Sequence, residues 1–538
     1  MEKNNFNYME NSFTENNNTG YTAPTYNAGE YRPQIVREYS RREVCFAFAG
    51  LVLGFMFIKL MAAPVLARGN AFGLGAAVTL LAATAYCTLF PAQRNKITAA
   101  KVIRIALCIA FSVNVFVTSN TLIQFLDIVF VLLTLAYDKL ADSDGKFNIG
   151  RRLFPADMMT ALFRPLTEMP AQPSAIKQAA SKSKGGKTLG NILLGLVIAI
   201  PSTVIVCNLL MSADEGFSEI MESLFENIAE NLVVFLIQAA ISLPVGCYIF
   251  GMCIKSMEKP GSDSDENALR NIRGLRIIPA FAGAASAAPV CVMYVIFFFS
   301  QASYFLSAFA SRLPSDTVSY SEYARRGFFE LCTVAVINLI IIIGINLFCK
   351  YNDDGSRPGC IKIISCIVSI FTLLLIATAV SKMALYIDAY GLTPLRVYTT
   401  WFMLLLAVIF LGIFLSLITA KVNLPKLSVI AFTVMFSALS FVNVEGIIVS
   451  VNADRYLAGT LESFDPEFID QMSTAAIPAA CKLRGKLSTD YENEELEDII
   501  RKKVVRAETG DVRSLTVSDI MARNAARNTA NNTAENSY

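Results

Sequence analysis

The sequence predicts an all-α fold: a polytopic transmembrane bundle of about eleven helices, with a cytoplasmic N-terminus and a small helical appendage at the outer C-terminal end. Three observations predict it. Of 538 residues, 54% are hydrophobic and 17% are charged, whereas soluble domains carry about 25% charged residues. Apolar runs recur along the chain, and basic residues concentrate in alternate loops. These features exclude an ordinary soluble protein.

Residue counts also limit the chemistry. Histidine is absent, which excludes Ser-His-Asp triads, His-bearing zinc sites, His-ligated haem and histidine phosphorelays. The 12 cysteines include no C-x-x-C pair, so buried free thiols are the simplest interpretation. We therefore expect no metal and no cofactor.

Eleven apolar runs are long enough, or nearly so, to cross a membrane, which takes about 20 residues per helix. The third and fourth runs are short and are separated by Thr118-Ser119-Asn120, so they form either a tight hairpin of two spans or a partly re-entrant pair. The runs are 44–63, 71–90, 102–117, 121–137, 189–211, 232–254, 277–305, 327–349, 361–385, 395–418 and 427–448.

Loop charges orient these runs, because Lys and Arg accumulate on the cytoplasmic side. With the N-terminus inside, the inner segments hold 27 basic residues and the outer loops hold 4. The resulting organisation is a disordered cytoplasmic tail (1–43), a transmembrane domain (44–448), an outer helical appendage (449–528) and a disordered end (529–538). The protein is expected in the cell membrane.

The appendage and one outer loop show helical patterns. Asp465-Pro466 resembles a helix start, and a second helix is predicted near Asp490, with pairs from Glu497 to Arg501 and from Asp498 to Lys502. The loop 212–231 has six acidic residues and no basic ones. An amphipathic surface helix explains it better than a calcium site, because EF-hand spacing is missing.

Ionisable residues inside apolar runs are costly and therefore mark ion pairs or functional groups. Lys59 and Asp127 fall at similar depth in the outer half of the membrane, which favours an intramembrane ion pair over a proton relay. Glu330 and Lys382 have the same relation. Gly50 and Gly54 form a G-x-x-x-G pattern that permits close helix packing.

Two segments at the outer face, 320–331 and 382–396, combine arginine with tyrosine. Arginine forks bind phosphate or carboxylate, so a lipid headgroup, a cell-wall precursor or an anionic solute would suit them. The alternative is an interfacial belt that only anchors helix depth. The candidate ligand-binding residues are Arg325, Arg326, Glu330, Lys382, Tyr386, Asp388, Tyr390 and Arg396; no catalytic residue is assigned.

The motifs Y-A-R-R-G-F-F-E-L (323–331) and M-A-L-Y-I-D-A-Y-G-L-T-P-L-R (383–396), with 209–214 and 452–457, resemble a bacterial polytopic family catalogued only as a domain of unknown function, of the DUF4173 or DUF4153 type. The resemblance runs from about residue 44 to residue 483. It implies a bacterial multi-pass membrane protein without an established activity. Where relatives often carry arginine before the second motif, this chain has Lys382, which keeps the charge and loses the fork.

Three functions remain open. A non-enzymatic sensing, signalling or scaffold protein needs no catalytic constellation and ranks first. A transporter of a small anionic solute or lipid would show inverted repeats and broken helices. An enzyme acting on a lipid-linked substrate, with Glu330 or Asp388 as base, ranks last. The expected partners are membrane lipids, with another membrane or extracytoplasmic protein as a further candidate, and no nucleic acid is expected.

Overall fold

The computed structural model describes most of the chain and places residues from Tyr39 onward in one compact unit. The described residues are 37–62, 72–91, 97–143, 148–151, 153–182, 228–257, 273–309, 328–419 and 421–535, together with residue 270 and short stretches between 199 and 221. Within these residues the regular elements are helices, apart from one bridge between Ile278 and Cys349.

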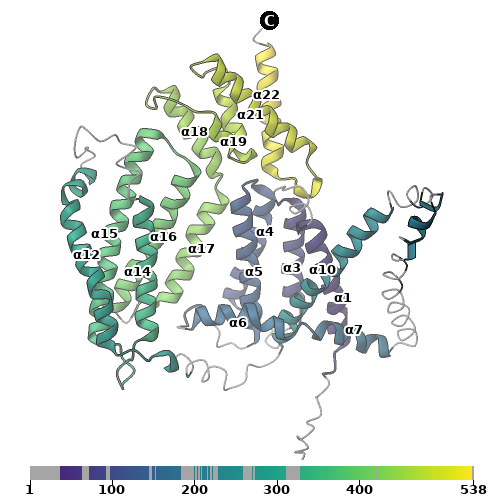
Figure 1. Cartoon of the computed structure of the whole chain (residues 1–538), viewed down its shortest axis with the longest axis horizontal. Coiled ribbons are helices and arrows are strands. Elements are labelled where there is room, and N and C mark those ends of the chain that lie inside the picture. Colours follow the sequence, from purple (N-terminus) through teal and green to yellow (C-terminus); the bar gives the residue numbers. More distant parts are fainter. Residues whose placement is uncertain are drawn as a thin grey trace, which may run out of the picture. The chain divides into compact units, whose positions relative to one another are not determined.

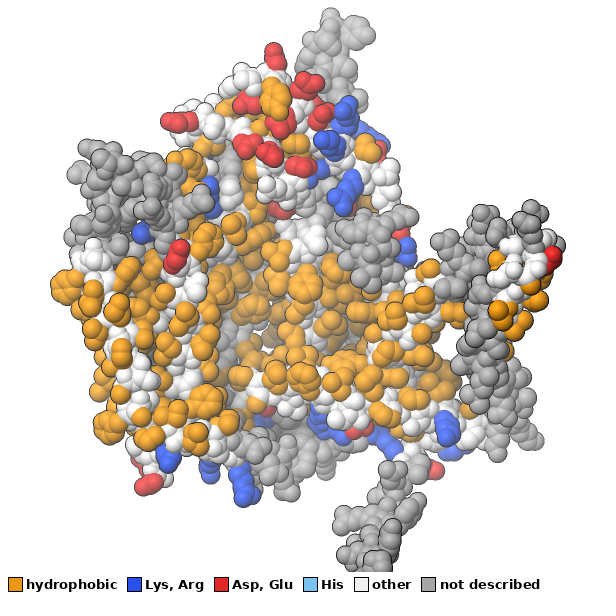
Figure 2. Space-filling model, viewed as in Figure 1, with side chains coloured by type: hydrophobic (Ala, Val, Ile, Leu, Met, Phe, Trp, Pro, Cys, Tyr) orange, Lys and Arg blue, Asp and Glu red, His pale blue; other side chains and the backbone are white. Residues whose placement is uncertain are grey.

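Nine helices in the described part are long and apolar enough to cross a membrane. Figure 2 shows the corresponding belt of apolar side chains, with charged side chains above and below it. The chain is therefore a multi-pass membrane protein. The nine segments are Arg41–Ala62, Ala99–Val117, Thr121–Ser143, Val234–Lys255, Ala280–Ser300, Phe328–Phe348, Gly359–Tyr390, Pro394–Ile418 and Leu424–Phe441.

The expected runs and the observed helices differ at three places. The second run forms only the shorter apolar helix α3 (Leu74–Leu89). The fifth run, 189–211, lies mostly where the structure is not described, as does about half of the acidic loop 212–231. The last run is divided, because one helix ends at Phe441 and the next begins at Val444. The number eleven therefore stays a prediction.

The short third and fourth runs are complete helices, α4 (Ala99–Val117) and α5 (Thr121–Ser143), of 19 and 23 residues. They pack against each other across the turn at 118–120. A 19-residue helix is about 28 Å long, which matches the hydrocarbon core. The hairpin interpretation is thus confirmed over the re-entrant one in length and packing.

A first group of helices packs around α1 (Arg41–Met56) and α10 (Ile228–Lys255), with α3, α4, α5, α6 (Phe154–Thr167) and α7 (Ala171–Lys182). The predicted glycine pattern makes a close contact between two of these helices. A Cβ at Gly54 would lie 2.5 Å from the Ser242 carbonyl oxygen and 2.8 Å from the Gly246 nitrogen. Glycine is therefore required where α1 crosses α10.

The second group comprises α12 (Ala280–Phe309), α14 (Phe328–Phe348), α15 (Gly359–Tyr390) and α16 (Pro394–Ile418), which stand side by side (Figure 1). Helix α17 (Leu424–Phe441) packs on α16 and joins the two groups. Its Phe436 ring stacks on Phe111 of α4 at 5.4 Å. Its Ser440 reaches the α4–α5 hairpin through hydrogen bonds.

The C-terminal appendage is drawn in yellow-green in Figure 1. It has a hydrophobic core of its own. The second predicted helix is confirmed: α21 begins at Asp490 behind a Thr489–Glu492 capping box. The last helix runs to Glu535, beyond Asn528, where disorder is predicted to begin. The elements are α18 (Val444–Leu457), α19 (Glu467–Asp470), η2 (Thr474–Ala476), α20 (Ile477–Ala480), η3 (Cys481–Leu483), α21 (Asp490–Thr509), η4 (Val512–Ser514) and α22 (Val517–Glu535).

The appendage contacts the bundle at the end of α1 opposite the α1 N-terminus. There α1 passes into a π turn, Phe57–Ala62, and Arg513 Nη1 donates to the Lys59 carbonyl at 2.9 Å. Leu74 N donates to the Leu515 carbonyl at 3.0 Å. We call this the appendage end; the α4–α5 turn and the α15–α16 turn lie there too, as their hydrogen bonds to the appendage show.

We predict that Gly54→Ala destabilises the bundle by about 1–3 kcal/mol, because the added methyl group overlaps the backbone of α10. Gly344→Ala is the matched control, since nothing lies within 4 Å of a Cβ at that position on α14. The temperature at which the detergent-solubilised protein loses its native size-exclusion peak measures both. Equal shifts in the two variants would contradict the close packing of α1 on α10.

Candidate functional site

Most of the residues predicted to bind a ligand lie at the end of α15 and the start of α16. Lys382, Tyr386, Asp388 and Tyr390 are on α15, and Arg396 is in the first turn of α16. Gly391 forms the turn between them with φ +74°. Arg325 and Arg326 lie outside the described residues. The turn is therefore the part of the predicted cluster that can be analysed.

Arg396 folds back onto the end of α15. Its Nη1 atom donates to the carbonyls of Tyr390 at 3.1 Å and Gly391 at 2.5 Å. Its guanidinium lies 4.0 Å from the centre of the Tyr386 ring. The last carbonyls of a helix lack partners within the helix and carry partial negative charge. Arg396 thus caps α15 and holds it against α16.

The motif at 452–457 clamps the same turn from α18. Arg455 donates to the carbonyls of Ile387 at 2.9 Å and Asp388 at 2.5 Å, and it lies 3.6 Å from the Asp388 carboxylate. The Asn452 amide accepts from Leu392 N and donates to Leu392 O, both at 2.8 Å. These contacts, with those of Arg396, make up what we call the joint.

The joint explains the motifs at 383–396 and 452–457 structurally. The guanidinium groups of Arg396 and Arg455 are occupied by main-chain carbonyls of one turn. Bonds to charged donors contribute about 1.5–3 kcal/mol each, so a ligand would have to replace strong internal contacts. For Arg396 this arrangement favours the anchoring alternative over ligand binding.

The structure does not bring Lys59 to Asp127. Asp127 is fully buried and accepts hydrogen bonds from Asn114 Nδ2 at 2.8 Å and Ser440 Oγ at 2.6 Å. No ion pair joins it to Lys59 within the described residues. The carboxylate is satisfied by neutral donors from α4 and α17, so it ties three helices together without a cation. Glu330, by contrast, stays within electrostatic range of Lys382.

A cavity of about 620 Å³ opens at the appendage end. Its walls come from five separate parts of the chain: the α4–α5 turn, the start of α16, the start of α18, the α19–η2 segment and the stretch from α21 to α22. The size suits a small-molecule ligand. Lining residues used below are Ser119, Asn120, Leu122, Tyr398, Glu445, Thr474, Lys502, Lys503, Arg506 and Asp519.

Two acidic residues of the wall are satisfied internally. Glu445 accepts from Asn120 Nδ2 at 2.6 Å and from Ser473 N at 3.0 Å. Asp519 accepts from Thr474 Oγ1 at 2.6 Å and from the nitrogen of Thr516 at 2.9 Å. These carboxylates hold the appendage to the bundle and to itself, and their oxygens already have hydrogen-bond partners. The other two acidic residues of the wall, Asp470 and Asp511, pair with Lys503 and Arg513.

The basic residues of the wall differ among themselves. Lys503 donates to the carbonyls of Asp470 at 2.8 Å and Met472 at 2.7 Å. Lys502 and Arg506 are exposed and one helical turn apart on α21. The expected pair from Asp498 to Lys502 is not formed, because Arg501 bonds Asp498 at 2.7 Å instead.

The cavity therefore presents two cations without ion-pair partners in the described part of the chain, beside the hydroxyl and amide groups of the α4–α5 turn. Such a set of groups suits an anion. Sequence reasoning missed it because the walls come from segments up to 400 residues apart. The only local signal is the spacing of Lys502 and Arg506 on one helix face.

A family model described as a domain of unknown function, DUF4153, matches residues 105–483. The match includes the joint and ends before α21, which carries Lys502 and Arg506. No curated protein and no solved structure matches the chain.

We predict that Gly391→Ala destabilises the protein by about 1–3 kcal/mol more than Gly355→Ala. Both glycines have positive φ, +74° and +75°, so both variants place a side chain in a backbone conformation that favours glycine. Only at Gly391 would a Cβ meet a neighbour, Asn452 Oδ1 at 2.8 Å. Thermal unfolding of the two variants measures the difference; its absence would contradict a tightly closed joint.

Burial lowers the pKa of Lys503 below its usual value, against the opposing effect of the Asp470 carboxylate. The folded protein then binds this proton less tightly than the unfolded chain does. The free energy of unfolding should therefore rise with pH between the lowered pKa and the unfolded value of about 10.4. Lys503→Met should flatten this slope in thermal unfolding midpoints, and identical slopes would contradict the burial of a charged ammonium.

Proposed function

The chain belongs to the DUF4153 family, and we propose that it is a non-enzymatic sensing or scaffold protein that binds an anionic ligand in the cavity at the appendage end. The observation that carries the proposal is the difference between the acidic and the basic side chains that line the cavity. Glu445 and Asp519 are satisfied by internal donors, whereas Lys502 and Arg506 face the cavity without ion-pair partners in the described residues.

We further propose that the appendage lies outside the cell and that the chain begins in the cytoplasm of a cell-membrane protein. The distribution of basic residues along the sequence supports this orientation, because the loops assigned to the inner side hold 27 of them and the outer loops hold 4. The cavity would then be open to ligands from the extracytoplasmic side or from the outer leaflet of the membrane.

Sensing follows from the way in which the cavity is assembled. Its walls belong partly to the membrane bundle, through Asn120 and Tyr398, and partly to the appendage, through Lys502 and Arg506. A ligand that contacts both stabilises one arrangement of the two parts over others. The joint connects the appendage to the turn between α15 and α16, so such a change is transmitted to membrane-spanning helices without any catalytic step.

The cavity also has apolar residues on its bundle side, including Leu122, which is 50% exposed, and Pro394. An anionic head with an adjoining apolar part would therefore contact both kinds of wall. Phosphate is the simplest anionic group of this kind, and a lipid headgroup and a free solute both carry it. The two sources are distinguished by experiment below.

We predict that the full-length protein in nanodiscs binds dioctanoyl phosphatidic acid, and that the Lys502→Glu/Arg506→Glu variant binds it at least about tenfold more weakly. The expected loss of about 1.4 kcal/mol corresponds to one charge-assisted contact. Isothermal titration calorimetry measures both affinities. Inorganic phosphate as a second probe separates a free anion from an amphiphile.

The control is Arg501→Glu, because Arg501 is on the same helix, is 75% exposed and pairs with Asp498 away from the cavity lining. It should leave the affinity unchanged. Equal weakening by the control and by the double variant would indicate a general charge effect and would sink the proposal, as would wild-type protein that binds neither probe.

A further inference from the structure

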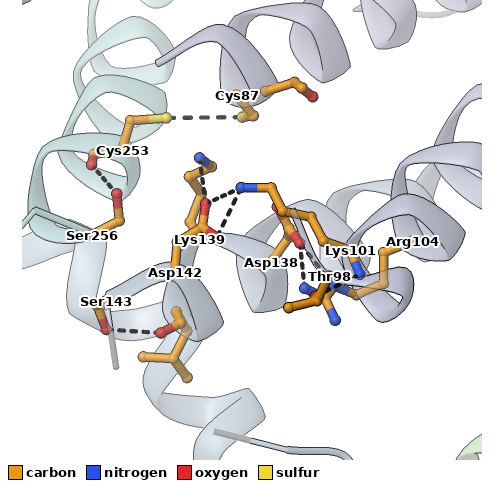
Figure 3. A network of polar contacts seen from close by, with 12 residues as sticks. Cys87, Thr98, Lys101, Arg104, Asp138, Lys139, Asp142, Ser143, Cys253 and Ser256 are labelled. Carbon is orange, nitrogen blue, oxygen red and sulfur yellow. Dashed lines mark hydrogen bonds and ion pairs between the residues drawn. The ribbon is translucent and has the colours of Figure 1, made fainter. Parts of the chain in front are cut away.

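Two cysteine thiols meet at the end of the bundle opposite the appendage. Cys87 on α3 and Cys253 on α10 are both buried, and their Sγ atoms are 3.9 Å apart. Figure 3 shows the two side chains pointing toward each other from neighbouring helices, beside a network of charged residues from α4 and α5.

The adjacent network has one more cation than it has carboxylates. Asp142 accepts from Lys101 Nζ at 2.9 and 2.8 Å and from Lys139 Nζ at 3.1 Å. Arg104 pairs with Asp138 at 2.7 Å. Three basic side chains thus share two acidic ones. Lys139 is the most deeply buried of them, with 1% of its side chain exposed.

A buried charge without full compensation costs several kcal/mol, so the network favours an additional anion close to Lys139. The two thiols are the groups that can provide it, because the Lys139 ammonium interacts electrostatically with both Cys87 and Cys253. A thiolate at one of them would equalise the charges. The thiolate is also the reactive form of cysteine, and reactive cysteines have basic neighbours.

A water-sized cavity lies beside the Lys139 side chain. A cavity of about 20 Å³ lies between α5, α6 and α10, lined by Lys139, Met252 and Ser256 among others. About 10–15 Å³ is enough for one water molecule. Hydrogen peroxide is only slightly larger than water, so it fits beside Lys139. Neither cysteine lines this cavity, and both are buried, so peroxide must pass between side chains to reach the sulfur atoms.

We propose that Cys87 and Cys253 form a redox pair that hydrogen peroxide oxidises to a disulfide. The Cys87 thiolate attacks one oxygen of the peroxide, and the O–O bond breaks, which gives a sulfenic acid and hydroxide. The hydroxide takes up the proton that Cys87 lost when it became a thiolate, and it leaves as water. The Cys253 thiol then attacks the sulfenic sulfur, the S–O bond breaks, and a second water molecule leaves. Two thiols and one peroxide thus yield one disulfide and two waters.

Formation of the disulfide needs only a small movement of the two side chains. The sulfur atoms must approach from 3.9 Å to a bond length of about 2.05 Å. The product would link α3 to α10 covalently. The disulfide is neutral, so oxidation also removes the anion that balances Lys139, and a reducing thiol would restore it.

The test uses the full-length protein in nanodiscs, treated with hydrogen peroxide, blocked with N-ethylmaleimide, digested and analysed by mass spectrometry. We expect a Cys87–Cys253 linked peptide that dithiothreitol removes. Lys139→Met should slow its formation about tenfold, and Lys139→Arg, which keeps the charge, should restore most of the rate. Cys253→Ser should leave a sulfenic acid at Cys87 that dimedone labels.

Cys108→Ser is the control, because Cys108 is an equally buried free thiol on α4; it should not change the linked peptide. The proposal is overturned if the linked peptide is absent while other cysteines are oxidised, or if it forms at the wild-type rate in Lys139→Met. If Lys139→Met does not fold, the wild-type linkage and the Cys253→Ser labelling decide the outcome.

Discussion

The contact on which the arrangement of the appendage depends is the capping of the turn at Gly391 by side chains from two other helices. Arg396 and Arg455 supply positive donors to the last carbonyls of α15, and Asn452 satisfies both main-chain groups of Leu392. Polar main-chain groups at a helix end near the membrane surface must find partners. The joint provides them from within the protein, and in doing so it fixes α18 and the whole appendage on the bundle.

The cavity is a consequence of that arrangement. The appendage is held at the joint on one side and by Arg513 at the end of α1 on another, and the space between these attachments is not filled by apolar side chains. Polar and apolar residues both line it, at the boundary between two separately packed cores. The cationic part of its wall lies on α21, after the end of the family match at residue 483.

Local and periodic signals in the sequence were sufficient for much of the fold. The break at Thr118-Ser119-Asn120 marks the α4–α5 hairpin, the helical pattern from Asp490 onward marks α21, and Gly50 and Gly54 mark a close helix crossing. Pairings between distant residues were not accessible in the same way. The ion pair between Lys59 and Asp127 was predicted only from their similar depth in the membrane. That reasoning does not consider neutral donors such as Asn114 and Ser440, which bind Asp127 in the structure. The cavity needs five distant segments to be placed, and no single one of them carries its signature.

The π turn at the end of α1 links folding of the appendage to folding of the bundle. A π turn contains about one residue more than the corresponding α-helical turn and has poorer internal bonding, so it persists only where its surroundings hold it. Here Arg513 bonds the Lys59 carbonyl, and Gly75 allows α3 to approach the Leu60 carbonyl, which lies 2.3 Å from a hypothetical Cβ. Detachment of the appendage would let α1 rewind by one residue and shift its register against α3. The packing of α1 against α3 is consequently coupled to the contact that the appendage makes with this turn.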